Sequence, residues 1–220
     1  MSANPSSHGA DVPRRFEQFF EHEHLLGERI FAAGAAISAA LERVANVSDL
    51  RLDPKAWNPP PPVQVPAPVL QAMGYFVYLL DHFADQVHLR AEESMFDIAV
   101  ACGMPKEKRA WVDQQHRTAR AYWKLITVAY ERIQADDIDD RWFAVRDFIA
   151  ATRAFVFLFQ AHAYRENNST YPAAGQYIDA ADDDQVMKLV QQFGWQDVTP
   201  FVWMVSQMES LLGIPSPPPG

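Results

Sequence analysis

The sequence is poor in cysteine, in basic clusters and in long apolar runs. Cys102 is the single cysteine among 220 residues, which excludes an internal disulfide framework and is typical of a reducing compartment. The formal net charge is −9 and no basic stretch occurs, so nucleic-acid binding is excluded, because phosphate recognition needs clustered lysine and arginine. No run approaches the roughly 18 apolar residues of a membrane span, and the opening "MSANPSSHGADVP" lacks the apolar core of a signal peptide. We therefore expect a cytoplasmic protein with neither nucleic-acid nor membrane partners.

Strand patterns and the common catalytic motifs are also missing. The alternation of apolar and polar residues that marks a half-buried strand is nearly absent. The chain contains no glycine-rich phosphate loop, no GxSxG element and no CxxC pair. Helical periodicity dominates instead, and an apolar content of 49% is enough for one sizeable core. These features predict an all-α fold.

Proline, glycine and acidic turns divide the chain into helices. The expected helices cover about 14–46, 68–101, 106–134, 141–167, 183–192 and 198–212. Residues 47–67 form a proline-rich connection, because proline lacks the amide hydrogen that a helix needs. The four long helices predict an up-down-up-down four-helix bundle over 14–175. A helical extension, 176–213, is expected to cover the bundle or to provide a homodimer surface, and 1–13 and 214–220 are expected to be tails.

Two stretches repeat one spacing of histidine and glutamate. "HLRAEESMF" places His88 four residues before Glu92, and "HAYRENNSTYP" places His162 four residues before Glu166. Residues four apart share a helix face, so each pair can supply two ligands to one site. Such a pair is more often a weak ion pair on a helix surface. Here both pairs lie within apolar helices, where a buried glutamate is costly unless a cation neutralises it.

Two further histidines lie on the other long helices. His116 falls on the apolar stripe of the third helix, and His22 or His24 lies in "FFEHEHLL" on the first. A lone histidine on such a stripe is more often a core residue than a ligand. At 1.5 Å per residue, however, the histidines on antiparallel helices meet at a similar height, roughly 30 Å from the connecting turns. At about 100° per residue, His22 lies about 80° and His24 about 120° from the apolar line of the first helix, so phase slightly favours His22.

The chain therefore repeats one arrangement, a histidine on one helix followed by HxxxE on the next. A pseudo-twofold bundle of this kind can enclose two metal ions, with imidazoles as terminal ligands and carboxylates that bridge. Four histidines and two glutamates suit iron, with manganese or zinc as alternatives. A purely structural metal site is a weaker interpretation of this mixed ligand set.

The residues around these histidines resemble the hemerythrin-like, or HHE, cation-binding family. "EHLLGERIF", "FADQVHLRAEESMF", "QQHRTARAYWKL" and "LFQAHAYRENNSTYPAA" are similar to the family's motifs on its first, second, third and fourth helices. The resemblance covers about residues 16–175. It favours His24 over His22, because only that register leaves Ile30 and Phe31 at the apolar positions of the first motif. It implies the metal ligands His24, His88, Glu92, His116, His162 and Glu166.

The chain also departs from the oxygen-carrying members of that family. Arg120 stands where they have a second histidine on the third helix, and Glu166 stands where they use an aspartate five residues after the histidine. The resemblance therefore implies a non-haem dimetal protein, with two irons, that binds O₂, NO or peroxide for sensing, storage or redox defence. The alternative is a diiron oxidase, oxygenase or peroxidase acting on a small organic substrate, which would need a pocket beside the metals.

Neighbouring side chains are candidates to support the ligands. Glu93 is expected to accept a hydrogen bond from a ligand or to face solvent, and Asp85 can orient a ligand from one turn before His88. Arg120 is expected near the metals or paired with a bridging glutamate. Cys102 is expected to be a small buried hydrophobe.

Overall fold

The structure is a computed structural model that describes residues 14–45, 62–135, 137–195 and 197–215. The predicted tail 1–13 and most of the proline-rich connection lie outside the described residues. Within the described ranges the regular structure is helical and contains no strand, which confirms the all-α prediction. None of the described helices combines the length and the apolar character needed to cross a bilayer.

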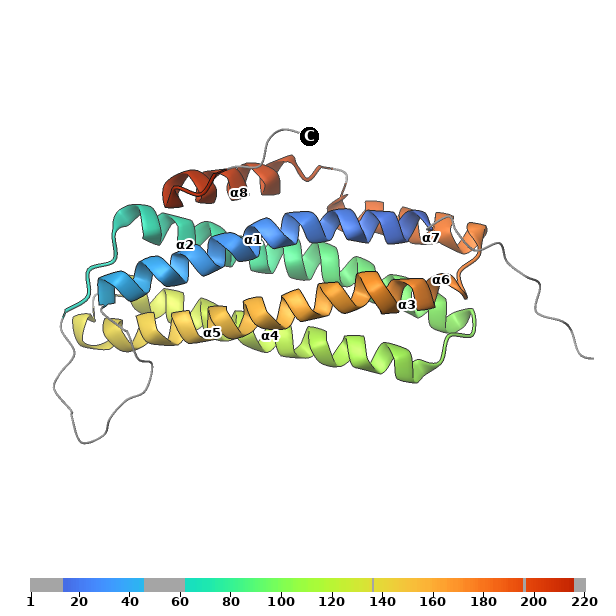
Figure 1. Ribbon diagram of the computed structural model, residues 1–220, viewed down its shortest axis with the longest axis horizontal. Coiled ribbons are helices and arrows are strands. Elements are labelled where there is room, and N and C mark those ends of the chain that lie inside the picture. Colours follow the sequence, from blue (N-terminus) through green and yellow to red (C-terminus); the bar gives the residue numbers. More distant parts are fainter. Residues whose placement is uncertain (1–13, 46–61, 136, 196, 216–220) are drawn as a thin grey trace, which may run out of the picture.

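Long helices account for most of the described chain (Figure 1). Two are uninterrupted α-helices, α1 (Arg15–Ala45) and α4 (Lys106–Gln134), and α5 (Ile138–Arg165) is the third long α-helix. A composite helix is made of α2 (Ala67–Leu79), the π-helical segment η1 (Leu80–Leu89) and α3 (Arg90–Ala101). The predicted bounds of the third helix agree with those of α4, because Pro105 fixes its start and its apolar stripe runs unbroken to Ile133.

These long helices lie alongside one another in Figure 1. α5 contacts α4 and α1, and α2 contacts α1 and α4, so each has a neighbour on two sides. Their apolar faces meet in a core of fully buried side chains, including Ile37, Phe76, Ile126 and Phe148. Because one face of each helix is buried in this way, polar side chains on those faces are held away from water.

The predicted end of the fourth helix at residue 167 was wrong. The helix continues through the π-helical segment η2 (Glu166–Thr170) into α6 (Tyr171–Gly175), although Pro172 lies in its path. The Tyr171 amide donates to the Glu166 carbonyl, five residues earlier, so the turn before the proline is wider than an α-helical turn. The wider turn lets the chain continue past a residue that would clash in a regular helix.

The C-terminal extension packs on the outside of the long helices. It consists of α7 (Ala180–Val190), the π-helical segment η3 (Gln191–Trp195) and α8 (Thr199–Leu212). α7 contacts α3 and α1, and α8 lies across α2 and α1 (Figure 1). α7 begins earlier than predicted, because the Asp179 side chain caps it by accepting from the Ala181 and Asp182 amides. The extension thus covers the long helices, and a homodimer surface on it stays a prediction.

The prediction that Cys102 is buried was wrong. Cys102 is exposed at the end of α3, where Gly103 turns the chain with a φ of 106°. Its Sγ donates to the Asp182 carboxylate of α7 at 3.2 Å. The helix ends before this residue, so the apolar face of α3 does not include it.

An ion pair links α8 to α1. Arg29 donates through Nε and Nη2 to both carboxylate oxygens of Glu209, each at 2.8 Å, and Glu209 is only 3% exposed. We expect Arg29→Ala to lower the free energy of unfolding by about 2–3 kcal/mol, because it leaves a buried carboxylate without this cation. The effect is smaller than for a fully buried pair, because Arg29 is a quarter exposed.

Urea denaturation measures this effect, and Arg153→Ala is the matched control. Arg153 pairs with Glu42 at 2.7 Å on the surface, where such a pair contributes less than about 1 kcal/mol. Equal losses in the two variants would show that α8 is not held by its ion pair.

Candidate metal centre

A layer of buried polar side chains separates two apolar clusters of the core. One cluster includes Leu26, Leu89, Ala119 and Phe159, and the other includes Phe20, Ala91, Val112 and Tyr171. The histidines and glutamates that the sequence singled out lie where these two clusters adjoin on the long helices. The structure brings together all six predicted ligands, each at most 3% exposed: His24, His88, Glu92, His116, His162 and Glu166.

The choice between the two histidines of α1 is decided by burial. His24 is 3% exposed and faces the other histidines, whereas His22 is exposed. Helical phase favoured His22, which is the exposed residue of the two, because it assumed a narrow apolar stripe. α1 is contacted by α2, α5, α7 and α8, so its buried arc is wide enough to include both Glu23 and His24.

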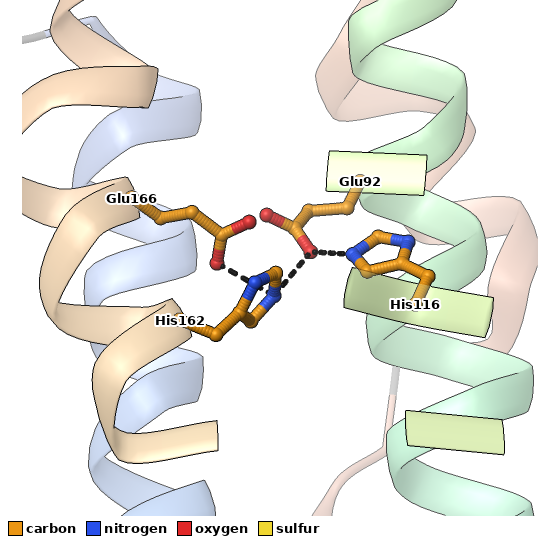
Figure 2. Close-up of side chains that lie close together, drawn as sticks. All are labelled: Glu92, His116, His162 and Glu166. Carbon is orange, nitrogen blue, oxygen red and sulfur yellow. Dashed lines mark ion pairs between the residues drawn. The ribbon is translucent and has the colours of Figure 1, made fainter. Parts of the chain in front are cut away.

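The two glutamates lie between the histidines. Glu92 Oε2 is 3.2 Å from His116 Nε2, 3.7 Å from His88 Nε2 and 4.0 Å from His162 Nε2. Glu166 Oε2 is 3.0 Å from His162 Nε2 and 3.5 Å from His24 Nε2. Figure 2 shows the two carboxylates turned toward each other, with His116 and His162 beside them.

The histidines form two pairs. The ring centroids of His24 and His88 are 5.1 Å apart, and those of His116 and His162 are 5.2 Å apart. Each carboxylate has an oxygen within 4.0 Å of a histidine from both pairs. The site therefore has the approximate twofold arrangement expected from the repeated sequence pattern.

Three of the histidines are held by a hydrogen bond on the nitrogen that faces away from the centre. In each case Nδ1 bonds to a side-chain oxygen and Nε2 is turned inward. The contacts are His24 to Asn167 Oδ1 at 2.8 Å, His88 to Glu23 Oε2 at 2.7 Å, and His116 to Glu93 Oε1 at 3.0 Å. An Nδ1–H that donates to such an oxygen fixes the tautomer and leaves the Nε2 lone pair free for a metal.

The sequence predicted only one of these three acceptors. Glu93 was a candidate, whereas Glu23 and Asn167 were missed. Glu23 is an acidic residue that directly follows the exposed His22. Only the packing of α1 against its neighbours shows that Glu23 is buried. Asn167 directly follows the predicted ligand Glu166, and this adjacency was the available signal for a supporting residue.

His162 is held by packing instead. Its Nδ1 has no hydrogen-bond partner, and its ring stacks on Trp111 with centroids 5.8 Å apart and planes 28° from parallel. The Arg165 guanidinium also lies over the Trp111 ring, 4.1 Å from its centroid. The orientation of the His162 imidazole thus depends on its stacking against Trp111.

The inward-facing atoms fit a cation. Glu92, His116, His162 and Glu166 each offer one ligand atom, and these atoms lie within 4.8 Å of one another. Several inward atoms have no hydrogen-bond partner among the described residues: Nε2 of His88, His116 and His162, Oε2 of Glu92, and both carboxylate oxygens of Glu166. Buried polar atoms are rarely left without partners, because their desolvation is then uncompensated. The cluster can hold a metal ion, and nitrogen and oxygen donors of this kind do not by themselves identify which metal.

The electrostatics of the cluster favour the same conclusion. Burial raises the pKa of Glu166 well above its usual range, and the negative charge of Glu92 raises it further. Burial, together with the nearby His88, lowers the pKa of His24 to about 4. Burial likewise lowers the pKa of His162 to about 3, with the His116 charge acting in the same direction. Two of the imidazoles are therefore neutral at pH 7, the form in which they bind metals. Burial lowers the pKa of His88 and His116, but the carboxylates of Glu23 and Glu92 outweigh it and raise the pKa of both, so a cation bound there would replace a proton.

Tyr171 belongs to the site, and sequence reasoning did not single it out. Its hydroxyl donates to Glu92 Oε1 and lies 3.5 Å from His24 Nε2. Its ring stacks on the imidazole of His24, with centroids 5.8 Å apart and planes 15° from parallel. Burial raises the pKa of the phenol well above its usual value, so the hydroxyl keeps its proton. The "YP" step of the fourth-helix motif was the available signal.

We expect Tyr171→Phe to weaken metal binding about tenfold. The ring packing is retained, but Glu92 loses a donor that orients its carboxylate, and losses of about 10–100-fold are typical of such supporting hydrogen bonds. Competition with a chelator of known affinity measures the change. Tyr164→Phe is the control, because Tyr164 is 71% exposed. An unchanged affinity in Tyr171→Phe would show that the hydroxyl does not orient Glu92.

Two predictions about supporting residues need correction. Asp85 does not bond to a histidine; it accepts from Arg120 Nε at 2.7 Å. Arg120 does not face the cluster or pair with Glu92 or Glu166; its Nη1 donates to Glu93 Oε1 at 2.7 Å. Both side chains are partly exposed on the flank of the bundle, so they act on the ligands only through Glu93.

A small enclosed cavity adjoins His24 and His88. Its walls are otherwise mainly apolar and include Gly27, Phe31 and Phe83. Its volume is about 10 Å³, counted as the space that the centre of a water-sized molecule can occupy, which is enough for about one such molecule. The cavity therefore has room for about one water-sized molecule and not for an organic substrate.

Comparisons with known proteins found no relative. No protein-family model, curated protein or solved structure matches this chain. The resemblance to the HHE family therefore rests on the sequence motifs, and the function has to be argued from the geometry of the site.

Proposed function

We propose that this chain is a hemerythrin-like protein in which four long helical rods form an up-down-up-down bundle around two metal ions. The observation that carries the proposal is the position of Glu92 and Glu166, each with an oxygen within 4.0 Å of a histidine from both pairs. A carboxylate in such a position can bridge two ions, because it has two oxygens. The neighbour relations of α1, α2, α4 and α5 support the bundle.

The ligands divide between two ions. His24 and His88 would hold one ion, His116 and His162 the other, and the two glutamates would lie between them. Imidazole and carboxylate ligands in this proportion suit iron, with manganese and zinc as alternatives. Two bound irons would supply reversible binding of small oxygen- or nitrogen-containing molecules and the exchange of electrons with them.

The protein's own residues prepare the site for such a ligand. The rings of Phe20, Phe83 and Phe159 each lie within 6.4 Å of an imidazole of the centre, measured between ring centroids, and exclude bulk water. Glu23 and Asn167 hold His88 and His24 from outside, which keeps their Nε2 atoms turned inward. The Tyr171 hydroxyl keeps a proton at a fixed place beside Glu92.

The size of the cavity at His24 and His88 favours a small ligand. At about 10 Å³ it is close to the space of one water molecule, whereas the sites of organic substrates measure roughly 300–1,000 Å³, so its size favours O₂, NO or a peroxide over an organic substrate. We therefore propose binding of one of these small molecules, for sensing, storage or redox defence, in preference to direct oxidation of an organic substrate at the centre.

Metal content and the visible spectrum test the proposal. The protein is purified aerobically, its metals are measured by mass spectrometry, and spectra are recorded after adding O₂, peroxide or NO. Two irons per chain, with an absorption band that changes with one of these ligands, are expected. One zinc per chain, with no visible band under any condition, would contradict both the diiron centre and its ligand chemistry.

A further inference from the structure

A second and much larger concavity lies on the flank of the long helices. It measures about 650 Å³, within the range of small-molecule sites, and lies between α2–η1 on one side and α4 on the other. Val77 and Leu80 line one wall, and Trp123 and Val128 line the other. We call this concavity the flank cleft. The centre described above uses none of these side chains as ligands.

Cationic groups gather at one end of the flank cleft. Arg120 and Lys124 both line it, one helical turn apart on α4. Arg120 uses Nε and Nη1 for Asp85 and Glu93, while its Nη2 makes no hydrogen bond to a described residue. Lys124 forms no ion pair with any residue that the structure describes. This end therefore has two uncommitted donors for an anion.

The acidic side chains of the cleft are paired, exposed to solvent or distant from that end. Asp85 pairs with Arg120 at 2.7 Å, and Asp81, whose side chain is 61% exposed, accepts from Gln86 Nε2 at 3.3 Å. Glu131 is seven residues beyond Lys124, so it lies about 10 Å farther along α4. The cleft thus has a cationic end, an apolar middle and an acidic far end.

The walls between these ends suit a flat apolar ring. Val77, Leu80 and Val128 present aliphatic groups. Tyr78 is 41% exposed and stacks on His82 with ring centroids 3.8 Å apart, so these two rings provide a flat surface at the cleft. An aromatic ring placed here would bury apolar area without leaving polar atoms unpaired.

Hydrogen bonds connect the cationic end to the metal centre. Arg120 Nη1 donates to Glu93 Oε1 at 2.7 Å, and the same oxygen is 3.0 Å from His116 Nδ1. On its inner side, His116 Nε2 is 3.2 Å from Glu92 Oε2. The guanidinium at the cleft is therefore separated from the ligand imidazole by a single carboxylate.

We propose that the flank cleft binds a small aromatic molecule carrying a carboxylate or sulfonate, and that its occupancy is coupled to the metal centre through Arg120, Glu93 and His116. The anion of the occupant pairs with Lys124 and with the free donor of Arg120. The anion's charge weakens the attraction between the guanidinium and Glu93 and so changes how strongly Glu93 holds His116. The coupling, but not the binding, rests on the proposed metal centre.

The binding itself is tested on metal-free protein with anilinonaphthalene sulfonate, an aromatic sulfonate that fluoresces when it is shielded from water. A titration is expected to show one saturable site. Lys124→Glu should weaken the Kd about tenfold or more, because it reverses a charge facing the sulfonate. Lys188→Glu makes the same charge change at an exposed position on α7 and should leave the Kd unchanged.

A neighbouring apolar surface provides the second control. Leu125 lines a separate, smaller concavity between α4 and α5 and is 57% exposed. Leu125→Ser should not affect the titration. Loss of binding in Leu125→Ser, or an equal effect of Lys124→Glu and Lys188→Glu, would place the probe elsewhere and overturn the assignment of the flank cleft.

The coupling is tested by repeating the titration on protein loaded with metal. Linked sites typically change each other's Kd by about 5–150-fold, and the effect is reciprocal. Glu93→Gln retains an oxygen for His116 but loses its charge toward Arg120, so the Kd should become the same with and without metal. Equal values in the wild type would overturn the coupling. If no metal binds at all, the proposed centre fails while the metal-free titration still decides the binding.

Discussion

Replacing Glu166 by methionine is expected to abolish binding of both metal ions while stabilising the metal-free protein. Glu166 Oε2 lies near a histidine of each pair, so its loss removes a ligand from both ions. In the metal-free protein both of its oxygens are buried without hydrogen-bond partners and face the Glu92 carboxylate. Methionine has a similar length and no charge. Because burial raises the pKa of Glu166, the group removed is a buried neutral carboxyl, and we expect a gain of about 1–3 kcal/mol in the free energy of unfolding, the desolvation cost of a buried polar group without partners.

Two measurements on the same variant separate a lost site from a lost fold. Metal content is measured by mass spectrometry, and stability is measured by urea denaturation in the presence of a chelator. Glu21→Met is the control, since Glu21 lies on the exposed face of α1 and should leave metal content unchanged. A variant that binds metal normally would remove Glu166 from the site. A metal-free variant less stable than the wild type would show that the carboxylate has a structural role.

Replacing His24 by alanine is expected to halve the metal content. His24 and His88 form one pair, and His24 is not among the four residues Glu92, His116, His162 and Glu166, whose ligand atoms all lie within 4.8 Å of one another. The ion held by that group should therefore remain when His24 is lost. This outcome distinguishes two ions from one, because a single shared ion would be lost completely or not at all.

His22→Ala is the matched control for this prediction. His22 lies two residues away on the same helix but is exposed, so the variant should retain full metal content. The reverse result, with loss only in His22→Ala, would show that helical phase had identified the correct residue. Measurement of metal per chain after dialysis against metal-free buffer gives the stoichiometry of each variant.

The composite helix and the end of α5 show where sequence reasoning stops for this fold. The start of α4 after Pro105 follows from proline chemistry that can be read locally, whereas the start of α7 after its cap Asp179 was predicted too late. The π-helical segments η1 and η2 could not be predicted, because no local residue pattern specifies a wider turn. Both lie at an HxxxE motif: η1 contains His88, and η2 begins at Glu166. Wider turns of this kind occur frequently at functional sites.

The supporting groups of the site were less predictable than the ligands. The ligands repeat at a fixed spacing on helices, so their shared face could be predicted from the period of the helix. Glu23 and Tyr171 act on residues 65 and 79 positions away, His88 and Glu92. No spacing rule connects positions so far apart, since their contact depends on how the helices are rotated about their axes.

The sequence by itself determined that this protein is helical, where its long helices lie, and that four histidines and two glutamates meet at one height. These properties follow from local periodicity, from proline and glycine, and from the fixed rise of a helix. Only the tertiary structure decided that His24 rather than His22 is buried, which oxygens hold the outer nitrogens, and that Arg120 faces the flank cleft instead of the cluster. These properties depend on which faces of neighbouring helices are pressed together, and this packing is settled by side chains far apart in the chain.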